Sequence, residues 1–429
     1  MSKIDVLLGL QWGDEGKGKI VDVLAPDYDV VARFQGGPNA GHTLIFDGKK
    51  HVLHCLPSGI FQKNTINLIG NGMVLDPVVL LKEINEVAKL APDVTDRLVI
   101  ARKTHLILPT HRLLDAAQEK RKGKQAIGST LRGIGPAYTD KVARQGIRAG
   151  DIYSSGFNAK LAKVIERHKE LLAWLDYDES FDDELEKWLA AVEKMRSIKL
   201  VDDSYYLYQQ LNNNKRILAE GAQGTLLDIS YGSYPFVTSS HTISGGVCTG
   251  LGVAPQHIGK VYGVFKAYCT RVGSGPFPTE QSGEIGQRIQ QNGNEFGATT
   301  GRERRCGWLD LAALKYACMI NGVDELFMMK GDVLSGFDSL PVATSYLDAK
   351  GDTTSDLPFD FADAEITPKY EELDGWQEDI SKLHKWSDLP KEFHDYIAFI
   401  EEKLKTPISI ASVGPDRNQT IKRSNQHEY

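Results

Sequence analysis

The chain has 429 residues, of which 57 are acidic and 50 basic, so its formal net charge at pH 7 is −7. Apolar residues make up 41 % and charged residues 25 %, the ordinary composition of a globular protein. This composition excludes an intrinsically disordered chain, and the mild acidity argues against nucleic acid as the main partner.

We expect a cytoplasmic protein without a membrane segment. The first residues, 1–5, carry charge within a short apolar run and do not resemble a signal peptide. No stretch approaches the ~20 uncharged apolar residues that a membrane helix needs. The five cysteines lack CxxC spacing, so we interpret them as small buried side chains rather than as disulfides or zinc ligands.

Short apolar runs alternate with polar loops and helical patterns along most of the chain. The runs that predict strands are 4–10, 30–32, 65–69, 217–219, 261–265, 325–329 and 408–410. Asp76 followed by Pro77 is typical of a helix start. This alternation favours an α/β fold with a large, mostly parallel central sheet and flanking helices.

We predict one large domain over 1–429, with two regions that depart from the alternation. Residues 151–200 have amphipathic helical spacing and are interpreted as a helical insertion, with His168 as a partly buried core residue. Residues 340–405, rich in acidic residues, Pro and aromatics, are interpreted as a less regular subdomain.

The loop after the first predicted strand is a modified phosphate-binding loop. Residues 13–19 fit GxxxxGK, whose glycines let backbone N–H groups and a helix start face an anion. The next residue is Ile20, whereas the ordinary loop has Ser or Thr there to hold Mg²⁺. Asp14 lies inside the loop instead, which suggests a Mg²⁺ ligand, a general base, or both.

Three further loops carry candidate chemistry. The small-residue turn 36–43 contains His42, which titrates near neutrality and could donate a proton. The segment 294–305 has three arginines suited to carboxylate or phosphate capture. Lys330-Gly331-Asp332 follows a predicted strand, and its carboxylate could accept the N1 and exocyclic N–H groups of guanine, with 412–417 as the other wall.

Together these motifs resemble the adenylosuccinate synthetase family. The resemblance rests on residues 11–19, 37–43, 127–138 and 220–225, on the arginine segment, and on 330–332. Matches run from about Leu8 to Arg417 and are thin in 151–200 and 340–400.

Membership implies the joining of IMP and L-aspartate with GTP and Mg²⁺ to give adenylosuccinate, GDP and phosphate. The resemblance implies that Asp14 removes the N1 proton of IMP, that O6 attacks the γ-phosphorus with help from His42, and that aspartate then displaces the 6-phosphoryl group. Lys17 would reach toward phosphate and Gln223 would share in catalysis. It also implies a homodimer in which Arg144 reaches the IMP site of the other subunit.

The resemblance also assigns binding residues. Asp14 and the carbonyl of Gly41 would hold Mg²⁺. GTP would meet Gly13, Asp14, Glu15, Gly16, Lys17, Gly18, Lys19, Gly41, His42, Thr43, Arg304, Lys330, Gly331, Asp332, Ser412, Val413 and Gly414. IMP would meet Asp14, Lys17, Asn39, Ala40, Gly41, His42, Thr130, Arg144, Gln223, Thr238 and Arg302. Aspartate would meet Ala298, Thr299, Thr300, Gly301, Arg302, Glu303 and Arg304.

Glu303 departs from the more basic run of relatives, and we expect its side chain to face outward. The main rival, a regulatory GTP switch, would need Ser or Thr at Ile20 and a DxxG element before 330–332, whereas the DxxG is 348–351. A dinucleotide-dependent dehydrogenase would need GxGxxG in the first strand–helix turn, which has other spacing. A GTP-dependent ligase of a related purine or amino acid is the nearest alternative.

Overall fold

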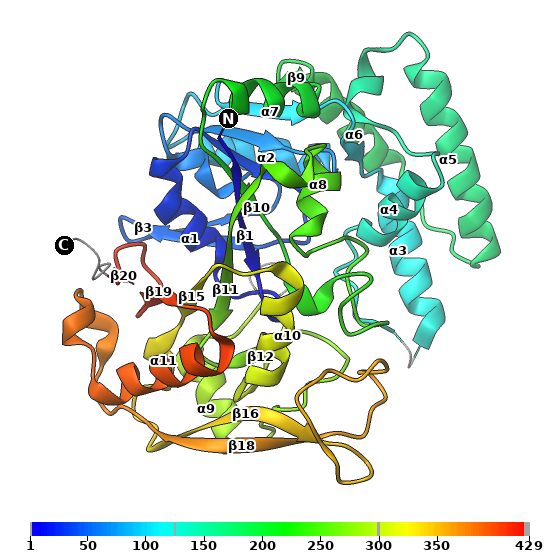
Figure 1. The fold of residues 1–429 in the computed structure, drawn as a ribbon. Coiled ribbons are helices and arrows are strands. Elements are labelled where there is room, and N and C mark those ends of the chain that lie inside the picture. Colours follow the sequence, from blue (N-terminus) through cyan, green and yellow to red (C-terminus); the bar gives the residue numbers. More distant parts are fainter. Residues whose placement is uncertain (1, 124–125, 298–300, 424–429) are drawn as a thin grey trace.

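A computed structural model describes residues 2–123, 126–297 and 301–423 (Figure 1). Within these ranges the centre is a ten-stranded sheet in the order β20-β19-β15-β11-β1-β10-β2-β5-β7-β9. All neighbouring pairs are parallel except β19 and β20. The bounds are β1 (Ile4–Gly9), β2 (Val30–Arg33), β5 (Ile66–Ile69), β7 (Leu98–Ala101), β9 (Lys199–Val201), β10 (Ile217–Glu220), β11 (Ile258–Lys266), β15 (Glu325–Met329), β19 (Ile408–Ser412) and β20 (Thr420–Lys422).

This sheet confirms the predicted α/β fold. Seven of its strands coincide with the predicted apolar runs, whereas β7, β9 and β20 were not predicted. A central parallel strand is covered on both faces, so it is apolar at consecutive positions. In β1, Val6, Leu7 and Leu8 are all fully buried. Leu7 packs under α1, whereas Val6 and Leu8 belong to the main core on the other face.

Helices surround the sheet. They are α1 (Lys17–Leu24), α2 (Pro77–Val87), α3 (Pro109–Lys122), α4 (Ile134–Val142), α5 (Phe157–Trp174), α6 (Asp182–Met195), α7 (Asp203–Asn212), α8 (Gly245–Leu251), α9 (Glu284–Gly293), α10 (Leu311–Asn321) and α11 (Lys391–Leu404). Helix α2 begins where predicted, because the Asp76 carboxylate accepts from the N–H groups of Val78 (2.9 Å) and Val79 (3.3 Å).

Smaller sheets lie around the edge. They pair β3 (His42–Phe46) with β4 (Lys49–Leu53), β6 (Val74–Leu75) with β8 (His105–Leu106), and β12 (Cys269–Arg271) with β13 (Arg305–Gly307); a fourth contains β14 (Leu309–Asp310), β16 (Ser339–Leu347), β17 (Thr353–Thr354) and β18 (Thr367–Asp374). Helices α3 to α6 gather on one side of the molecule, and the β16–β18 ribbon lies away from them (Figure 1).

The two regions that depart from the alternation contain regular structure. Residues 151–200 hold α5 and α6, as predicted, and 340–405 hold most of the β16–β18 ribbon and α11. His168 of α5 is fully buried. The division of the chain into one domain with insertions stays a prediction.

The parallel strands all end at one edge of the sheet, where ligands bind in open α/β folds. The loops that leave β1, β2, β10, β15 and β19 at this edge carry the phosphate loop, His42, Gln223, Lys330 and Gly414 respectively. Across the described residues, no helix combines the length and apolar character needed to cross a bilayer.

Candidate functional site

A cavity of about 1330 Å³ opens at this edge of the sheet. It is lined by most of the residues that the sequence predicted for binding: Gly13, Asp14, Glu15, Gly16, Lys17, Gly18, Lys19, Asn39, Ala40, Gly41, His42, Thr43, Thr130, Gln223, Thr238, Arg302, Arg304, Lys330, Asp332, Ser412 and Gly414. Five predicted residues do not line it, namely Arg144, Gly301, Glu303, Gly331 and Val413. Ala298, Thr299 and Thr300 lie outside the described residues.

The side chain of Glu15 fixes the conformation of the phosphate loop. Its buried carboxylate accepts from the backbone N–H groups of Gln11 (3.1 Å) and Gly13 (2.9 Å) and from Lys17 Nζ (2.5 Å). Gly16, which precedes α1 with a φ of 99°, offers no side-chain cap to the helix. The first N–H groups of α1 and its positive end are therefore left for an anion.

Close packing brings α1 against His42. A Cβ on Gly18 would lie 2.7 Å from the Cβ of His42, so only glycine fits there. The start of α1 and the turn that contains His42 are thus in direct contact.

His42 is oriented by Glu220, the last residue of β10. The Nδ1 atom of His42 lies 2.6 Å from Glu220 Oε1, and Ser58 donates to the same carboxylate through its hydroxyl (2.6 Å) and its N–H (2.8 Å). Burial opposes ionisation of Glu220, but hydrogen bonds from His42 and Ser58 and the nearby positive charges outweigh it, so its pKa lies below the usual value. Because an ionised carboxylate only accepts, the proton is on Nδ1.

The other imidazole nitrogen faces the cavity. Nε2 of His42 is buried and finds no partner among the described residues. Burial lowers the pKa of His42, although Glu220 works against this shift. Without a ligand, His42 is therefore neutral at pH 7, with the lone pair of Nε2 turned toward the cavity.

Asp14 and Arg304 meet across the cavity from opposite ends of the sequence. Arg304 Nε donates to Asp14 Oδ2 over 2.8 Å. Asp14 has a φ of 58°, a left-handed conformation that turns its carboxylate out of the loop, where 31 % of the side chain is exposed. The ion pair holds this carboxylate in the cavity, at the position predicted for a base.

The residues predicted to form the guanine pocket lie at the ends of β15 and β19 and in the loops that follow them. Asp332 lines the cavity, and its buried Oδ1 has no partner among the described residues. Burial raises the pKa of Asp332, so donors from a ligand would stabilise its charged form. Lys19, which was predicted to meet GTP, donates from Nζ to Ser412 Oγ (2.8 Å) and Gly414 O (2.8 Å) and so joins α1 to this pocket.

The cavity is also lined by Thr130, Gln223, Thr238 and Arg302, which were expected to hold IMP. Gln223 has a φ of 58°, and both polar atoms of its buried amide lack a partner within the described ranges. The loop that contains Thr130 is fixed by Asp115, which accepts from Ser129 Oγ (2.7 Å) and Gly133 N (2.9 Å), and by Glu119, which accepts from Gly128 N (2.9 Å). Arg302 Nη2 donates to Gly128 O (3.0 Å) and joins this loop to the arginine segment.

Two residues of the arginine segment face elsewhere. Glu303 is exposed, as expected, and bridges through its backbone to Phe296. Arg305 Nε donates to Glu280 Oε1 (2.8 Å) rather than to the cavity. The arginines that line the site in the described part of this segment are Arg302 and Arg304.

Sequence reasoning missed the supporting carboxylates. Glu220 was quoted within a motif, but Glu220, Asp115 and Glu119 received no role. Their only sequence signal is that each is an acidic residue in or near a glycine-containing loop motif.

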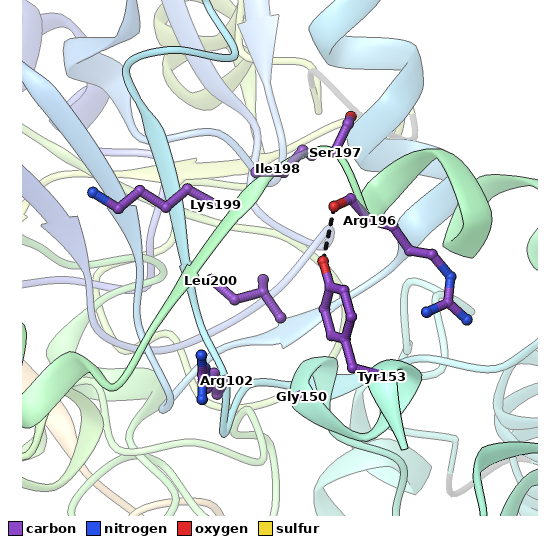
Figure 2. A pocket seen from close by; sticks show the side chains of 8 residues that line it. All are labelled: Arg102, Gly150, Tyr153, Arg196, Ser197, Ile198, Lys199 and Leu200. Carbon is purple, nitrogen blue, oxygen red and sulfur yellow. Dashed lines mark hydrogen bonds between the residues drawn. The ribbon is translucent and has the colours of Figure 1, made fainter. Parts of the chain in front are cut away.

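A second hollow of about 410 Å³ lies between Gly150 and strand β9 (Figure 2). The Tyr153 hydroxyl donates to Arg196 O (2.8 Å) across it. Its arginines are engaged elsewhere, Arg196 with Glu193 (2.7 Å) and Arg102 with Asp202 (3.8 Å). We therefore assign no ligand to this hollow.

The fold and the main cavity define a nucleotide-dependent α/β enzyme in which a phosphate loop, a base pocket and a second polar pocket share one space. The comparisons with known proteins narrow this class. The family model of adenylosuccinate synthetase matches residues 6–421.

Individual relatives agree over their full length. The chain is 58 % identical to adenylosuccinate synthetase from Christiangramia forsetii, covering 98 % of this chain and 100 % of that one. It is 56 % identical to adenylosuccinate synthetase from Flavobacterium johnsoniae, covering 97 % of this chain and 99 % of that one. The fully ligated adenylosuccinate synthetase from Plasmodium falciparum superposes with a TM-score of 0.94 at 40 % identity, covering 99 % of this chain and 100 % of that one.

The chain therefore belongs to the adenylosuccinate synthetase family. It is a GTP-dependent ligase that joins IMP and L-aspartate in the synthesis of AMP. The family resemblance drawn from the sequence is confirmed.

Proposed function

We propose that the ligation proceeds in two steps within this one cavity. Asp14 takes the N1 proton of IMP, and the electrons move to O6, which attacks the γ-phosphorus of GTP as the bond to the leaving GDP breaks. The amine of L-aspartate then attacks C6, and phosphate leaves with the O6 oxygen. The amine loses its protons as adenylosuccinate forms.

One observation carries this proposal. Buried polar groups face the same cavity without a partner in the described chain, among them His42 Nε2, Asn39 Oδ1, the Gln223 amide and Asp332 Oδ1. An unpartnered buried polar group is unfavourable, so such groups gather where a ligand completes their hydrogen bonds. Their positions beside the phosphate loop and in two pockets match a phosphate donor and a second purine.

The charges support the roles of Asp14 and His42. The phosphates of a bound nucleotide place negative charge beside Nε2 of His42, while Glu220 remains hydrogen-bonded to Nδ1. Both anions favour the imidazolium, so nucleotide binding raises the pKa of His42 and supplies a proton donor for the transferring group. Asp14 can act as a base once Arg304, now bound to it, turns toward the substrates.

The oxygen atoms expected to bind Mg²⁺ are present at the phosphate loop. The Asp14 carboxylate and the Gly41 backbone both line the cavity beside the start of α1, and hard oxygen donors are the ligands that Mg²⁺ prefers. Bound there, Mg²⁺ would neutralise part of the charge on the β- and γ-phosphates.

We also propose a homodimer that shares its sites. Arg144 is exposed and follows α4 with a φ of 62°, and it does not line the cavity of its own chain. Val142, two residues earlier, is apolar yet 80 % exposed beside the cavity, as expected of a surface that a second copy covers. The cytoplasmic location stays a prediction.

Positional isotope exchange tests the two-step reaction. GTP labelled with ¹⁸O in the β,γ-bridge is incubated with enzyme, Mg²⁺ and IMP, without aspartate. Reversible phosphoryl transfer would scramble the label into the non-bridging β-oxygens. We expect scrambling that requires IMP and falls by about 10² or more in Asp14→Asn.

A matched control is Asp47→Asn. Asp47 also has a positive φ (50°), but it is exposed on the β3–β4 turn and lies outside the cavity. Its variant should scramble the label at the native rate. Scrambling at the same rate with and without IMP, or at the native rate in Asp14→Asn, would contradict the proposal.

A further inference from the structure

Glu295 forms a buried charge cluster beside the cavity. It follows α9 and has no exposed surface. Within the described residues, Oε1 accepts from Lys266 Nζ (2.9 Å), Lys330 Nζ (2.6 Å) and the Tyr268 hydroxyl (2.5 Å), and Oε2 accepts from Arg304 Nη1 (2.5 Å). One carboxylate therefore anchors three cations from β11, the base pocket and the arginine segment.

The two oxygens of this carboxylate serve two different loops. Oε1 holds Lys330, which starts the loop that carries Asp332, while Oε2 holds Arg304, whose Nε reaches Asp14 (2.8 Å). The backbone adds a second link, because Arg304 N donates to Glu295 O (3.0 Å). A continuous chain of charged contacts thus runs from Lys330 through Glu295 and Arg304 to Asp14.

The cluster has few alternative arrangements. Lys266 is fully buried; its Nζ also donates to Thr270 Oγ1 (2.6 Å) and lies over the Tyr268 ring, 5.6 Å from the centroid. Burial opposes ionisation of Glu295, but the charges of Lys266, Lys330 and Arg304 outweigh it and hold its pKa well below the usual range. Because a buried carboxylate must keep its partners, a shift of one cation reorients the group that holds the others.

We propose that Glu295 is a positioning residue that couples recognition of the nucleotide base at Lys330 to the placement of Arg304 for the amino-acid substrate. This inference rests on the proposed function, which places guanine beside Lys330 and Asp332 and aspartate beside Arg304. A base that makes all its hydrogen bonds in the pocket fixes the position of Lys330. The Glu295 carboxylate, which accepts from both side chains, then fixes the position of Arg304. A base that makes fewer hydrogen bonds in the pocket leaves the side chains of Lys330 and Arg304 less ordered.

Steady-state kinetics with two nucleotides test the coupling. Inosine triphosphate lacks the exocyclic amine of guanine, so it makes one fewer contact with Asp332. In the native enzyme we expect the KM for aspartate to rise about fivefold or more when this nucleotide, at saturation, replaces GTP. In Glu295→Gln the aspartate KM should be about the same with inosine triphosphate as with GTP, so that the ratio of the two values is about one. The aspartate KM measured with GTP should itself be about tenfold higher than in the native enzyme.

Glu284→Gln is the matched control, because Glu284 is an exposed glutamate at the other end of the same helix and lies outside the cavity. It should keep the native ratio. Glu295→Asp retains the charge and should restore part of the ratio, which a purely structural role would not predict, and it serves if the Gln variant does not fold.

Failure of the proposed coupling can be distinguished from failure of the proposed guanine and aspartate sites. If Lys330→Met leaves the KM for GTP unchanged and Arg304→Lys leaves the KM for aspartate unchanged, the site assignment fails and this inference with it. If those variants behave as expected but a folded Glu295→Gln or Glu295→Asp enzyme keeps the full native ratio of aspartate KM values, or the native ratio is one, the coupling alone is overturned.

Discussion

His42 Nδ1 lies 2.6 Å from Glu220 Oε1, and this contact determines which imidazole nitrogen faces the cavity. Glu220 is itself fixed by both the hydroxyl and the N–H of Ser58, so the ring cannot turn without breaking a buried network. The result is a histidine whose Nε2 alone exchanges protons with the site.

Removing the charge of Glu220 should slow catalysis. In Glu220→Gln the amide supports the imidazolium less well, so we expect kcat to fall by about 10 to 100-fold. Glu220 raises the pKa of His42, so its loss should move the alkaline decline of kcat to lower pH. A pH profile of kcat measures both effects. An unshifted alkaline limb in an otherwise folded variant would show that Glu220 does not tune His42.

Nucleotide binding should take up a proton. Burial keeps the free His42 neutral near pH 7, whereas the bound phosphates favour its charged form. Isothermal titration of GTP at pH 7.5 in buffers of different ionisation enthalpy should report uptake of up to about one proton. The uptake should disappear in His42→Asn, and equal uptake by that variant would assign the proton to another group.

Two inactive variants should complement each other. If Arg144 serves the partner's site, a hybrid of Arg144→Leu and Asp14→Asn chains has one site with both residues intact. Random mixing should restore about a quarter of native activity, since half the dimers are hybrid and half of their sites are complete. Activity assays before and after mixing, with exchange confirmed by mass, measure this. No recovery in confirmed hybrids would place Arg144 in its own chain's site or in none.

Asp332→Asn should damage nucleotide recognition selectively. The amide replaces one acceptor with a donor that faces the donors of guanine, so we expect kcat/KM for GTP to fall by about 10² or more. The KM for aspartate, at saturating nucleotide, should rise only about fivefold, which is the coupling expected through Glu295. Asp356→Asn is a suitable control, because Asp356 is exposed and does not line the cavity.

A separate buried cluster should govern acid stability. Asp140 Oδ2 lies 3.2 Å from His111 Nε2 and 3.1 Å from His168 Nε2, and Arg167 contacts the same carboxylate (2.8 Å). His111 Nδ1 accepts from Leu108 N (2.9 Å), so its proton is on Nε2, which therefore donates to Asp140 and does not ligate a metal. We interpret the cluster as a structural link between α3, α4 and α5.

The pH dependence of this cluster has a definite sign. Burial lowers the pKa of His111. Burial opposes ionisation of Asp140, but its histidine partners outweigh it and lower its pKa. The unfolded chain therefore binds more protons, and stability should fall as pH drops below about 6.5. Urea unfolding of Asp140→Asn should show a loss of about 3 kcal/mol at pH 7 and a weaker acid dependence. Exposed Glu166→Gln on α5 should stay within about 0.5 kcal/mol of native.

Local features of the site could be predicted from sequence. Most strands of the central sheet are mainly apolar runs, whereas the edge strands β9 and β20 are not. The start of α2 at Asp76-Pro77 and the phosphate loop are short motifs whose chemistry lies in adjacent residues. Parallel strands bring the loops that follow them to one edge, so the gathering of 13–19, His42 and 330–332 follows from topology.

The partners of charged side chains could not be predicted in this way. Glu220 and His42 are 178 residues apart, and Asp14 and Arg304 are 290 apart. Arg305 and Arg304 are adjacent in sequence, yet one pairs with Glu280 and the other with Asp14. Such choices depend on strand order and backbone angles, which a single sequence does not reveal.

The most direct test of the account is product formation by the purified protein with IMP, GTP, Mg²⁺ and L-aspartate, each omitted in turn and with ATP exchanged for GTP. We predict adenylosuccinate and GDP in equal amounts only when all four are present. ATP should fail, because adenine leaves the polar groups of the Asp332 pocket unpaired. GTP hydrolysis at the same rate without IMP and aspartate would contradict the roles of Asp14, His42 and the arginine segment.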